Sequence, residues 1–203
     1  MRALFIAACV SVFAAGCIHQ FAEAPKATAD LAATKNSFVR GTANFVQLGD
    51  KVRVTASLSG LAPNGEYGFH IHEVGDCSSG DGMSTKGHFN PFGKPHAQAG
   101  LMDRHAGDLP SVRSDKSGHA TLVADVDVIT VTPGPASVIG RGLIVHAQAD
   151  DYKTQPTGNA GARSACGVIK AVEKAPEGPA KGAPKPPAKE PAKEPAKPAA
   201  QSG

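Results

Sequence analysis

The sequence predicts an all-β fold, either an antiparallel sandwich or a flattened barrel. Short runs of alternating apolar and polar residues dominate the middle of the chain, turn signals separate them, and no long amphipathic helix is visible. The runs are 38–48, 52–58, 67–72, 120–129, 143–147 and 167–172. Residues 36–172 form one domain of ordinary size, which buries roughly two-thirds of its unfolded surface.

Turn residues justify the runs in order along the chain. Gly49-Asp50 ends the first run, Pro63-Asn64-Gly65 precedes the run at 67–72, and Lys116-Ser117-Gly118 precedes the run at 120–129. A glycine-rich stretch, 75–107, lies between the runs at 67–72 and 120–129 and predicts long loops. Without bound ligands or a crosslink, such loops have little to order them.

The N-terminus predicts export. Met1-Arg2 precedes an apolar run, 3–16, which has the pattern of a secretory signal and is too short to span a membrane. Ala14-Ala15-Gly16-Cys17 resembles a bacterial lipobox, with Ala14 where leucine is usual. We therefore expect residues 1–17 to be a signal ending at a lipidated Cys17, which anchors the protein in the membrane, facing the periplasm or the outside. The alternative is ordinary cleavage to a soluble periplasmic form.

Two further segments fall outside the predicted domain. Residues 18–35 have no strong periodicity and are expected to be a flexible tether. Residues 173–203 are low-complexity Pro, Ala, Lys and Glu, and the prolines predict a disordered, extended tail. The tail is either a plain solvated segment or, because its lysines outnumber its glutamates, a contact for an anionic polymer of the envelope.

Six of the eight histidines fall into one spaced series, together with one aspartate. Neutral imidazoles in this number favour metal binding. The members are His70, His72, His88, His96, His105, Asp108 and His146. His119 and His19 lie outside the series and have no assigned role.

Spacing divides the series into two sets. His70 and His72 project from the same face of a strand, roughly 6–7 Å apart, and can chelate one ion. His105 and Asp108 meet if the intervening Ala106-Gly107 turns back on itself. His96 adds a third ligand to the second pair from its loop. If His88 joins both groups, one ion receives four nitrogens, from His70, His72, His88 and His146, which suits copper. The other receives three nitrogens and a carboxylate, from His88, His96, His105 and Asp108, which suits zinc. A histidine that bridges two metals must be an imidazolate.

Several motifs in this order resemble the copper–zinc superoxide dismutase family, over about residues 36–172. They are Gly-Phe-His-Ile-His-Glu, Gly-His-Phe-Asn-Pro, His-Ala-Gly-Asp-Leu-Pro, Val-His-Ala-Gln-Ala-Asp-Asp and Gly-Asn-Ala-Gly-Ala-Arg-Ser-Ala-Cys-Gly-Val-Ile. The resemblance implies a Greek-key antiparallel sandwich, related to immunoglobulin-like folds, with long metal-binding loops. It also implies the dismutation of superoxide to dioxygen and hydrogen peroxide by a Cu(II)/Cu(I) cycle, beside an imidazolate-bridged structural zinc.

The same resemblance assigns residues to roles. It implies copper ligands at His70, His72, His88 and His146, and zinc ligands at His88, His96, His105 and Asp108. It makes His88 and Arg163 catalytic, with Arg163 attracting superoxide, and it gives Asp150 hydrogen bonds to a ligand histidine of each metal. It pairs Cys77 with Cys166 as a structural disulfide, in keeping with export.

Two departures from the family are visible. The loop between Asp150 and Arg163 is shorter than in the better-known eukaryotic members, so the residues that steer the substrate are not carried over. Lys86, Lys94 and Lys153 are candidates for that steering charge. The stretch 77–87 looks more like bacterial members. The family pairs through different faces, which leaves a monomer and a homodimer open.

Two other classes of function compete. A metal-storage lipoprotein would need the ligands but neither a bridging histidine nor Arg163. A zinc hydrolase would need an open position on zinc, whereas four protein ligands fill it. The sequence excludes nucleic acid as a partner, because its basic residues are spread out and only 5% of its residues are aromatic.

Overall fold

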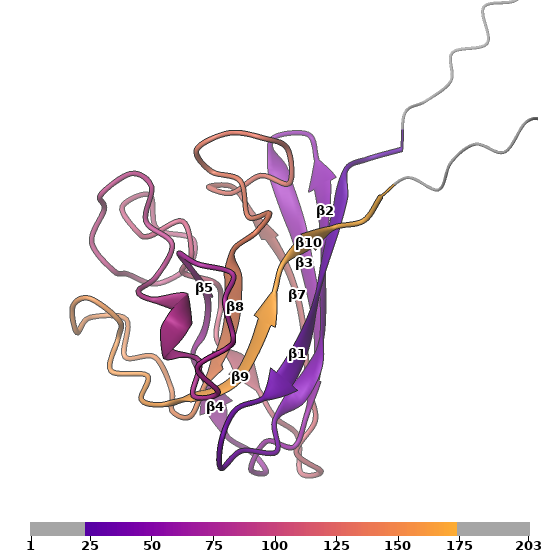
Figure 1. Cartoon of the computed structure of the whole chain (residues 1–203). Coiled ribbons are helices and arrows are strands. Elements are labelled where there is room, and N and C mark those ends of the chain that lie inside the picture. The colour runs from indigo at the N-terminus through magenta and orange to yellow at the C-terminus, as the bar shows by residue number, and fades with distance from the viewer. Residues whose placement is uncertain (1–22, 174–203) are drawn as a thin grey trace, which may run out of the picture. The chain divides into compact units, whose positions relative to one another are not determined.

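The computed structural model describes residues 23–173 and reveals an all-β architecture over them. Figure 1 shows most of the strands curling into one strongly bent sheet, with long loops projecting beyond it. The elements are β1 (Lys26–Ala33), β2 (Arg40–Leu48), β3 (Lys51–Ser59), β4 (Glu66–Tyr67), β5 (Phe69–His72), η1 (Met83–Thr85), β6 (Val112–Arg113), β7 (Ala120–Val126), β8 (Gly142–His146), β9 (Arg163–Val168) and β10 (Lys170–Ala171). The 3₁₀ turn η1 is the one helical element in this part of the chain.

The main sheet is antiparallel throughout, in the order β5-β8-β9-β1-β2-β3-β7. β10 also pairs with β1, and β4 and β6 form a separate two-stranded sheet. The predicted all-β antiparallel fold is confirmed. The first described strand lies between the second and the ninth, so that the two ends of the domain are hydrogen-bonded to each other.

The hairpin of β2 and β3 follows the predicted alternation. Phe45, Val52 and Val54 are completely buried, while neighbouring residues along each strand are exposed or half-buried. Gly49 has a φ of 61° in the turn, a conformation that glycine adopts at little cost. Burial of alternate side chains therefore fixes the register, because a slip by one residue would turn these side chains to solvent.

The tether predicted for 18–35 is wrong over its second half, where β1 runs from Lys26 to Ala33. Ala27, Ala29 and Leu31 alternate toward the core and are 1%, 1% and 4% exposed. Alanine has a weak strand preference, so this alternation did not stand out in the sequence. Pairing with β2, β9 and β10 decides the structure of the segment.

The strand predicted for 167–172 also begins in the wrong place. β9 starts at Arg163 and ends at Val168, and β10 follows as a short separate strand. Gly167 is responsible for the close approach there, since a Cβ at this position would lie 2.6 Å from the carbonyl oxygen of Asp30 on β1. The predicted run at 67–72 is likewise divided, into β4 and β5.

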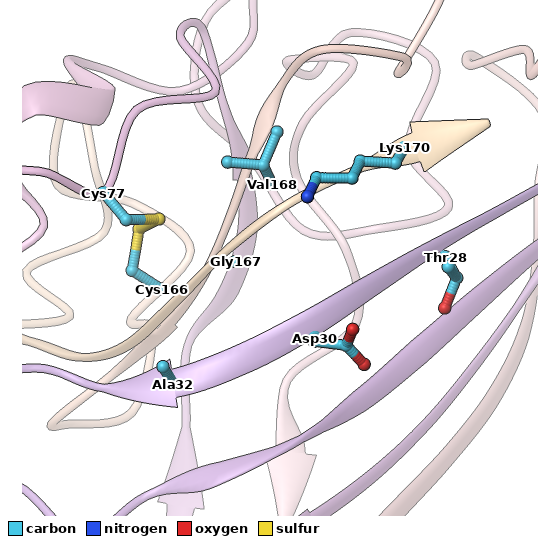
Figure 2. Close-up of a pocket in the computed structure, with 8 residues that line it drawn as sticks. All are labelled: Thr28, Asp30, Ala32, Cys77, Cys166, Gly167, Val168 and Lys170. Carbon is cyan, nitrogen blue, oxygen red and sulfur yellow. A yellow bond between two sulfur atoms is a disulfide. The ribbon is translucent and has the colours of Figure 1, made fainter.

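A disulfide joins the loop after β5 to β9. Cys77 and Cys166 are bonded, which confirms the predicted pair, and they close a loop of 89 residues in sequence separation. Figure 2 shows the disulfide at one side of a pocket whose lining comes from β1, β9 and β10, with Cys77 from the loop after β5. None of the residues that line this pocket belongs to the histidine series.

No helix among residues 23–173 is long and apolar enough to cross a membrane. The predicted signal and lipobox at 1–17, the first residues of the predicted tether and nearly all of the predicted tail lie outside the described residues.

Candidate metal centre

Two neighbouring strands, β5 and β8, position His70, His72 and His146. β5 pairs with β8, with His70 opposite Ile144 and His72 opposite Gly142. His146 ends β8 at a bulge, where the register with β9 shifts. All three side chains are nearly or completely buried, at 0%, 0% and 3% exposed. The predicted common face of His70 and His72 is confirmed, because both belong to the same group of clustered side chains.

The loops bring the remaining histidines against β5. Isolated bridges pair His72 with His88, and His70 with Asp108. The predicted turn through Ala106-Gly107 is present, closed by a 3.2 Å hydrogen bond from the amide of Asp108 to the carbonyl of His105. Gly107 is required there, since a Cβ would lie 2.2 Å from the carbonyl oxygen of Ile71.

These side chains form two buried groups that share one residue. In each group the potential ligand atoms all lie within 4.8 Å of one another. The four-histidine set consists of His70, His72, His88 and His146, and the aspartate set consists of His88, His96, His105 and Asp108. His88 belongs to both, as the resemblance implied.

Hydrogen bonds fix which ring nitrogen three members of the four-histidine set, His70, His72 and His146, turn to their neighbours. His70 donates from Nε2 to Asp150, at 2.8 Å, and His72 donates from Nδ1 to the carbonyl of Lys86, at 2.8 Å. His146 donates from Nδ1 to the carbonyl of Gly161, at 3.3 Å. In a neutral imidazole the other nitrogen then carries a lone pair. Each ring therefore offers one free lone pair to the set.

Asp108 organises the aspartate set. Its Oδ2 accepts the backbone amides of Ala97 and His105, at 3.1 and 3.0 Å. Its Oδ1 lies 2.9 Å from Nδ1 of His88 and 2.9 Å from Nδ1 of His96, and 3.4 Å from Nδ1 of His105. Three nitrogens and one carboxylate oxygen thus converge, which is a donor set that tetrahedral zinc accepts.

Two buried ring nitrogens lack a hydrogen-bond partner among the described residues and are free to bind metal ions. They are Nδ1 of His70 and Nε2 of His88. An unpaired buried polar atom is costly, and here both atoms belong to the four-histidine set. A cation bound there would satisfy both, and a set of four imidazoles suits copper. The residues present therefore fit copper in one set and zinc in the other.

Burial keeps three of these imidazoles neutral, those of His72, His88 and His146. Desolvation, with the nearby charges of other histidines, lowers the pKa of His72 well below its usual value and that of His146 to about 3. Desolvation also lowers the pKa of His88 to about 4, although Asp108 opposes the shift. For His96 desolvation is outweighed by hydrogen bonds to Asp108 and Asp150, which raise its pKa to about 9. Neutral rings are the form that binds metal.

Asp150 links the two sets. Its Oδ2 accepts from Nε2 of His70 and its Oδ1 from Nε2 of His96, at 2.8 and 2.9 Å. Burial opposes its ionisation, but these two hydrogen bonds and the amide of Tyr152 hold its pKa well below the usual range. One carboxylate therefore orients a histidine of each set, the arrangement that the resemblance implied.

Arg163 lies at the start of β9, beside the four-histidine set. Its guanidinium donates from Nη1 to the carbonyl of Gly82 and the hydroxyl of Thr85, and from Nη2 to the carbonyl of Lys86. That same carbonyl accepts the Nδ1 proton of His72. Desolvation lowers the pKa of Arg163, and the charge of Asp81 opposes the shift. A half-buried cation is thus held next to His72.

Three contributors were missed from the sequence. The backbone carbonyl of Lys86 holds both His72 and Arg163, and the side chain of Gln155 is hydrogen-bonded to the backbone of His96. A Cβ at Gly158 would lie 1.8 Å from Oδ1 of Asp150, so only glycine fits there. A sequence carries no signal for a carbonyl contact, whereas Gly158 opens one of the motifs on which the resemblance rests.

The three candidate steering lysines are all exposed. Lys94 forms an ion pair with Asp103 at 2.7 Å, which weakens its field at a distance. Lys86 contacts Arg163 directly, because its backbone carbonyl accepts a hydrogen bond from that guanidinium. Lys153 belongs to the short loop after Asp150, and its role in steering stays a prediction.

Comparisons with known proteins agree with this geometry. The family model described as copper/zinc superoxide dismutase (SODC) matches residues 39–169. Superoxide dismutase (Cu-Zn) 2 of Aquifex aeolicus (strain VF5) is 38% identical over 154 residues, covering 74% of this chain and 90% of that protein. The Cu-Zn superoxide dismutase of Paramecium bursaria Chlorella virus 1 is 41% identical over 137 residues, covering 64% of this chain and 72% of that protein.

Among solved structures, the crystal structure of the clock protein EA4 is similar to this chain. It superposes with a TM-score of 0.67 at 42% sequence identity, and the match covers 76% of this chain and 99% of that one. Nearly the whole of the other chain is therefore matched.

Proposed function

The chain belongs to the copper/zinc superoxide dismutase family, and from that premise we propose that it removes superoxide in the cell envelope as an exported, lipid-anchored enzyme. Dismutation itself follows from family membership together with the two ligand sets that meet at His88. When bound, copper supplies the one-electron redox couple of this reaction, and zinc supplies a redox-inert cation.

The residues of this chain perform the remaining tasks. His88 turns Nε2 toward the four-histidine set and Nδ1 toward Asp108, so it would hold a metal in each set only as an imidazolate, with no proton on either ring nitrogen. Its Nε2 is therefore the atom at which a proton can be taken up and returned. Asp150 keeps His70 and His96 oriented throughout.

Arg163 has the role of attracting and positioning the superoxide anion. Support for this comes from its fixed guanidinium, which is only half-buried and shares the Lys86 carbonyl with His72. A cation in such a place raises the encounter rate of a small anion. The bridging histidine and this arginine also distinguish the enzyme from a metal store with the same ligands.

The first test measures copper and zinc content and the dismutation rate on the same purified protein. We expect one copper and one zinc per chain, loss of activity when copper is removed, and recovery when copper is returned. Both metals bound without turnover would instead indicate storage. Turnover of an ester or amide by protein loaded with zinc alone would indicate the hydrolase alternative.

The role of Arg163 is tested by Arg163→Ile. We expect kcat/KM to fall about ten-fold or more while both metals stay bound. Arg113→Ile is the matched control, since Arg113 is an exposed arginine on β6 and its loss changes the net charge equally. Equal rates for Arg163→Ile and wild type would remove Arg163 from the mechanism.

The lipid anchor is tested by Cys17→Ser in cells fractionated into membrane and soluble envelope contents. We expect wild-type protein in the membrane fraction and the variant in the soluble fraction, with unchanged specific activity. Wild-type protein that is soluble in the periplasm would favour the alternative of simple signal cleavage. The size of the soluble variant in solution would also decide between a monomer and a homodimer.

A further inference from the structure

Gln155 grips the backbone of His96 with both ends of its side-chain amide. Its Oε1 accepts from the His96 amide nitrogen at 2.8 Å, and its Nε2 donates to the His96 carbonyl at 2.8 Å. His96 is 2% exposed, and it lies in a segment without regular secondary structure. Backbone groups at that depth need hydrogen-bond partners. Gln155 supplies both where no neighbouring strand does.

The ring of His96 is held from two further sides. Its Nε2 donates to Asp150, and its Nδ1 lies 2.9 Å from Oδ1 of Asp108. Asp150 immediately precedes the short loop 151–162, to which Gln155 belongs. The loop is itself anchored, because the hydroxyl of Tyr152 donates to Ser111 at 2.8 Å. The loop therefore contacts the backbone of His96 through Gln155. It also follows directly on Asp150, which accepts the hydrogen bond from Nε2 of the His96 ring.

The ligands that belong to the four-histidine set alone are positioned differently. His70, His72 and His146 lie on β5 and β8, where the backbone is fixed by strand pairing. His96 has no such ladder. A change at Gln155 should therefore affect the aspartate set and leave the four-histidine set in place.

We propose that Gln155 is a positioning residue for zinc, whose amide clamp on His96 keeps Nδ1 of that ring within reach of the other three ligands and slows zinc release. The inference rests on zinc occupying the aspartate set, as family membership implies, and not on export or the lipid anchor. It gives the short loop a function in metal retention.

The test compares three variants of the full chain loaded with both metals. Gln155→Met keeps the length of the side chain and removes both hydrogen bonds, and Gln155→Glu keeps the acceptor and removes the donor. Thr154→Val is the matched control, because it removes the hydrogen bond from Thr154 to Asp151 in the same loop without touching His96. Zinc release is followed with a chromogenic zinc chelator, and copper release is followed separately with zinc in excess.

We expect Gln155→Met to release zinc about 10- to 100-fold faster than wild type. Gln155→Glu should show a smaller acceleration, Thr154→Val should show none, and copper release should be unchanged in all three. The proposal is overturned if Gln155→Met releases zinc at the wild-type rate, or if it accelerates zinc and copper release equally. If Gln155→Met does not fold, the same two rates for Gln155→Glu decide. Wild-type and control protein that take up no zinc would overturn the zinc assignment itself, which is a separate failure.

Discussion

At the residue scale, Lys86 occupies a backbone conformation that suits glycine. Its φ is 62° and its ψ is −145°, a region in which a side chain costs of order 1–3 kcal/mol. Its carbonyl accepts from Nδ1 of His72 and from Nη2 of Arg163. The strained conformation thus aims one oxygen at two donors, and it places a lysine beside His72 and Arg163.

Gly158 is a second residue whose identity the centre requires. It has a φ of 66°, and a Cβ there would lie 1.8 Å from Oδ1 of Asp150 and 2.5 Å from Nε2 of His96. Those two atoms form the hydrogen bond that joins Asp150 to the aspartate set. A side chain at 158 would displace that bond.

We predict that Gly158→Ala lowers zinc affinity about 10- to 100-fold, because it separates Asp150 from His96. Zinc titration against a competing chelator measures the change. Gly140→Ala is the control, since Gly140 also has a positive φ, 76°, but no atom within 4 Å of an added Cβ. That control carries the backbone strain without the collision, so equal zinc affinities in the two variants would refute the collision as the cause.

At the element scale, β9 connects the disulfide to the centre. Arg163 begins the strand and Cys166 follows on it. The loop that Cys77 attaches to β9 also carries Gly82 and Thr85, whose oxygens hold the guanidinium of Arg163. Opening the disulfide therefore releases the loop from β9. The oxygens of Gly82 and Thr85 then hold the guanidinium of Arg163 less firmly.

We predict that the double variant Cys77→Ser, Cys166→Ser loses about 4–5 kcal/mol of unfolding free energy, given the 89-residue separation of the two cysteines. Denaturant unfolding of the metal-loaded protein measures it. We also expect a lower dismutation rate at equal copper content, because the guanidinium of Arg163 is no longer held in a fixed position. Wild-type protein treated with a reductant should behave in the same way, and an unchanged unfolding free energy in the double variant would contradict the prediction.

At the scale of the whole molecule, the sequence was most informative where side chains carry the chemistry. The ligand sets could be predicted because histidine and aspartate are metal-binding residues whose spacing reflects strand period and turns. β1 could not, since its alternating Ala27, Ala29 and Leu31 become a strand through pairing with distant strands. The clamp of Gln155 and the carbonyl of Lys86 are backbone contacts across 59 and 77 residues of separation, and no local pattern encodes them.

The buried histidines also determine how the metal-free molecule responds to acid. The folded-state pKa values of His72, His88 and His146 lie below the ordinary 6.5, with His88 at about 4 and His146 at about 3. Between pH 6.5 and pH 4 the unfolded chain therefore binds protons that the folded chain does not. Stability falls as the pH drops through this window, by up to about 1.4 kcal/mol per pH unit for each histidine.

Three other groups of the centre, His96, Asp108 and Asp150, act outside that window. The pKa of His96 is raised to about 9, so its stabilising contribution is complete below pH 6.5 and is lost only as the pH rises through about 9. Asp108 and Asp150 have lowered pKa values, and their contributions are lost only below about pH 4. A slope between pH 6.5 and pH 4 is therefore expected from His72, His88 and His146.

We predict that metal-free protein loses stability steeply from pH 6.5 to pH 4.5, whereas metal-loaded protein changes little until its metals are released. Bound cations occupy the same ring nitrogens, so protons must first compete with them. Denaturant unfolding at several pH values, for both forms, measures the two slopes. His119→Gln is the control, because His119 is exposed and outside both sets, and the variant should keep the wild-type slope. A metal-free protein whose unfolding free energy is constant over this range would mean that the rings of His72, His88 and His146 are not held neutral by the fold, and that the centre is assembled by the metals and not by the chain.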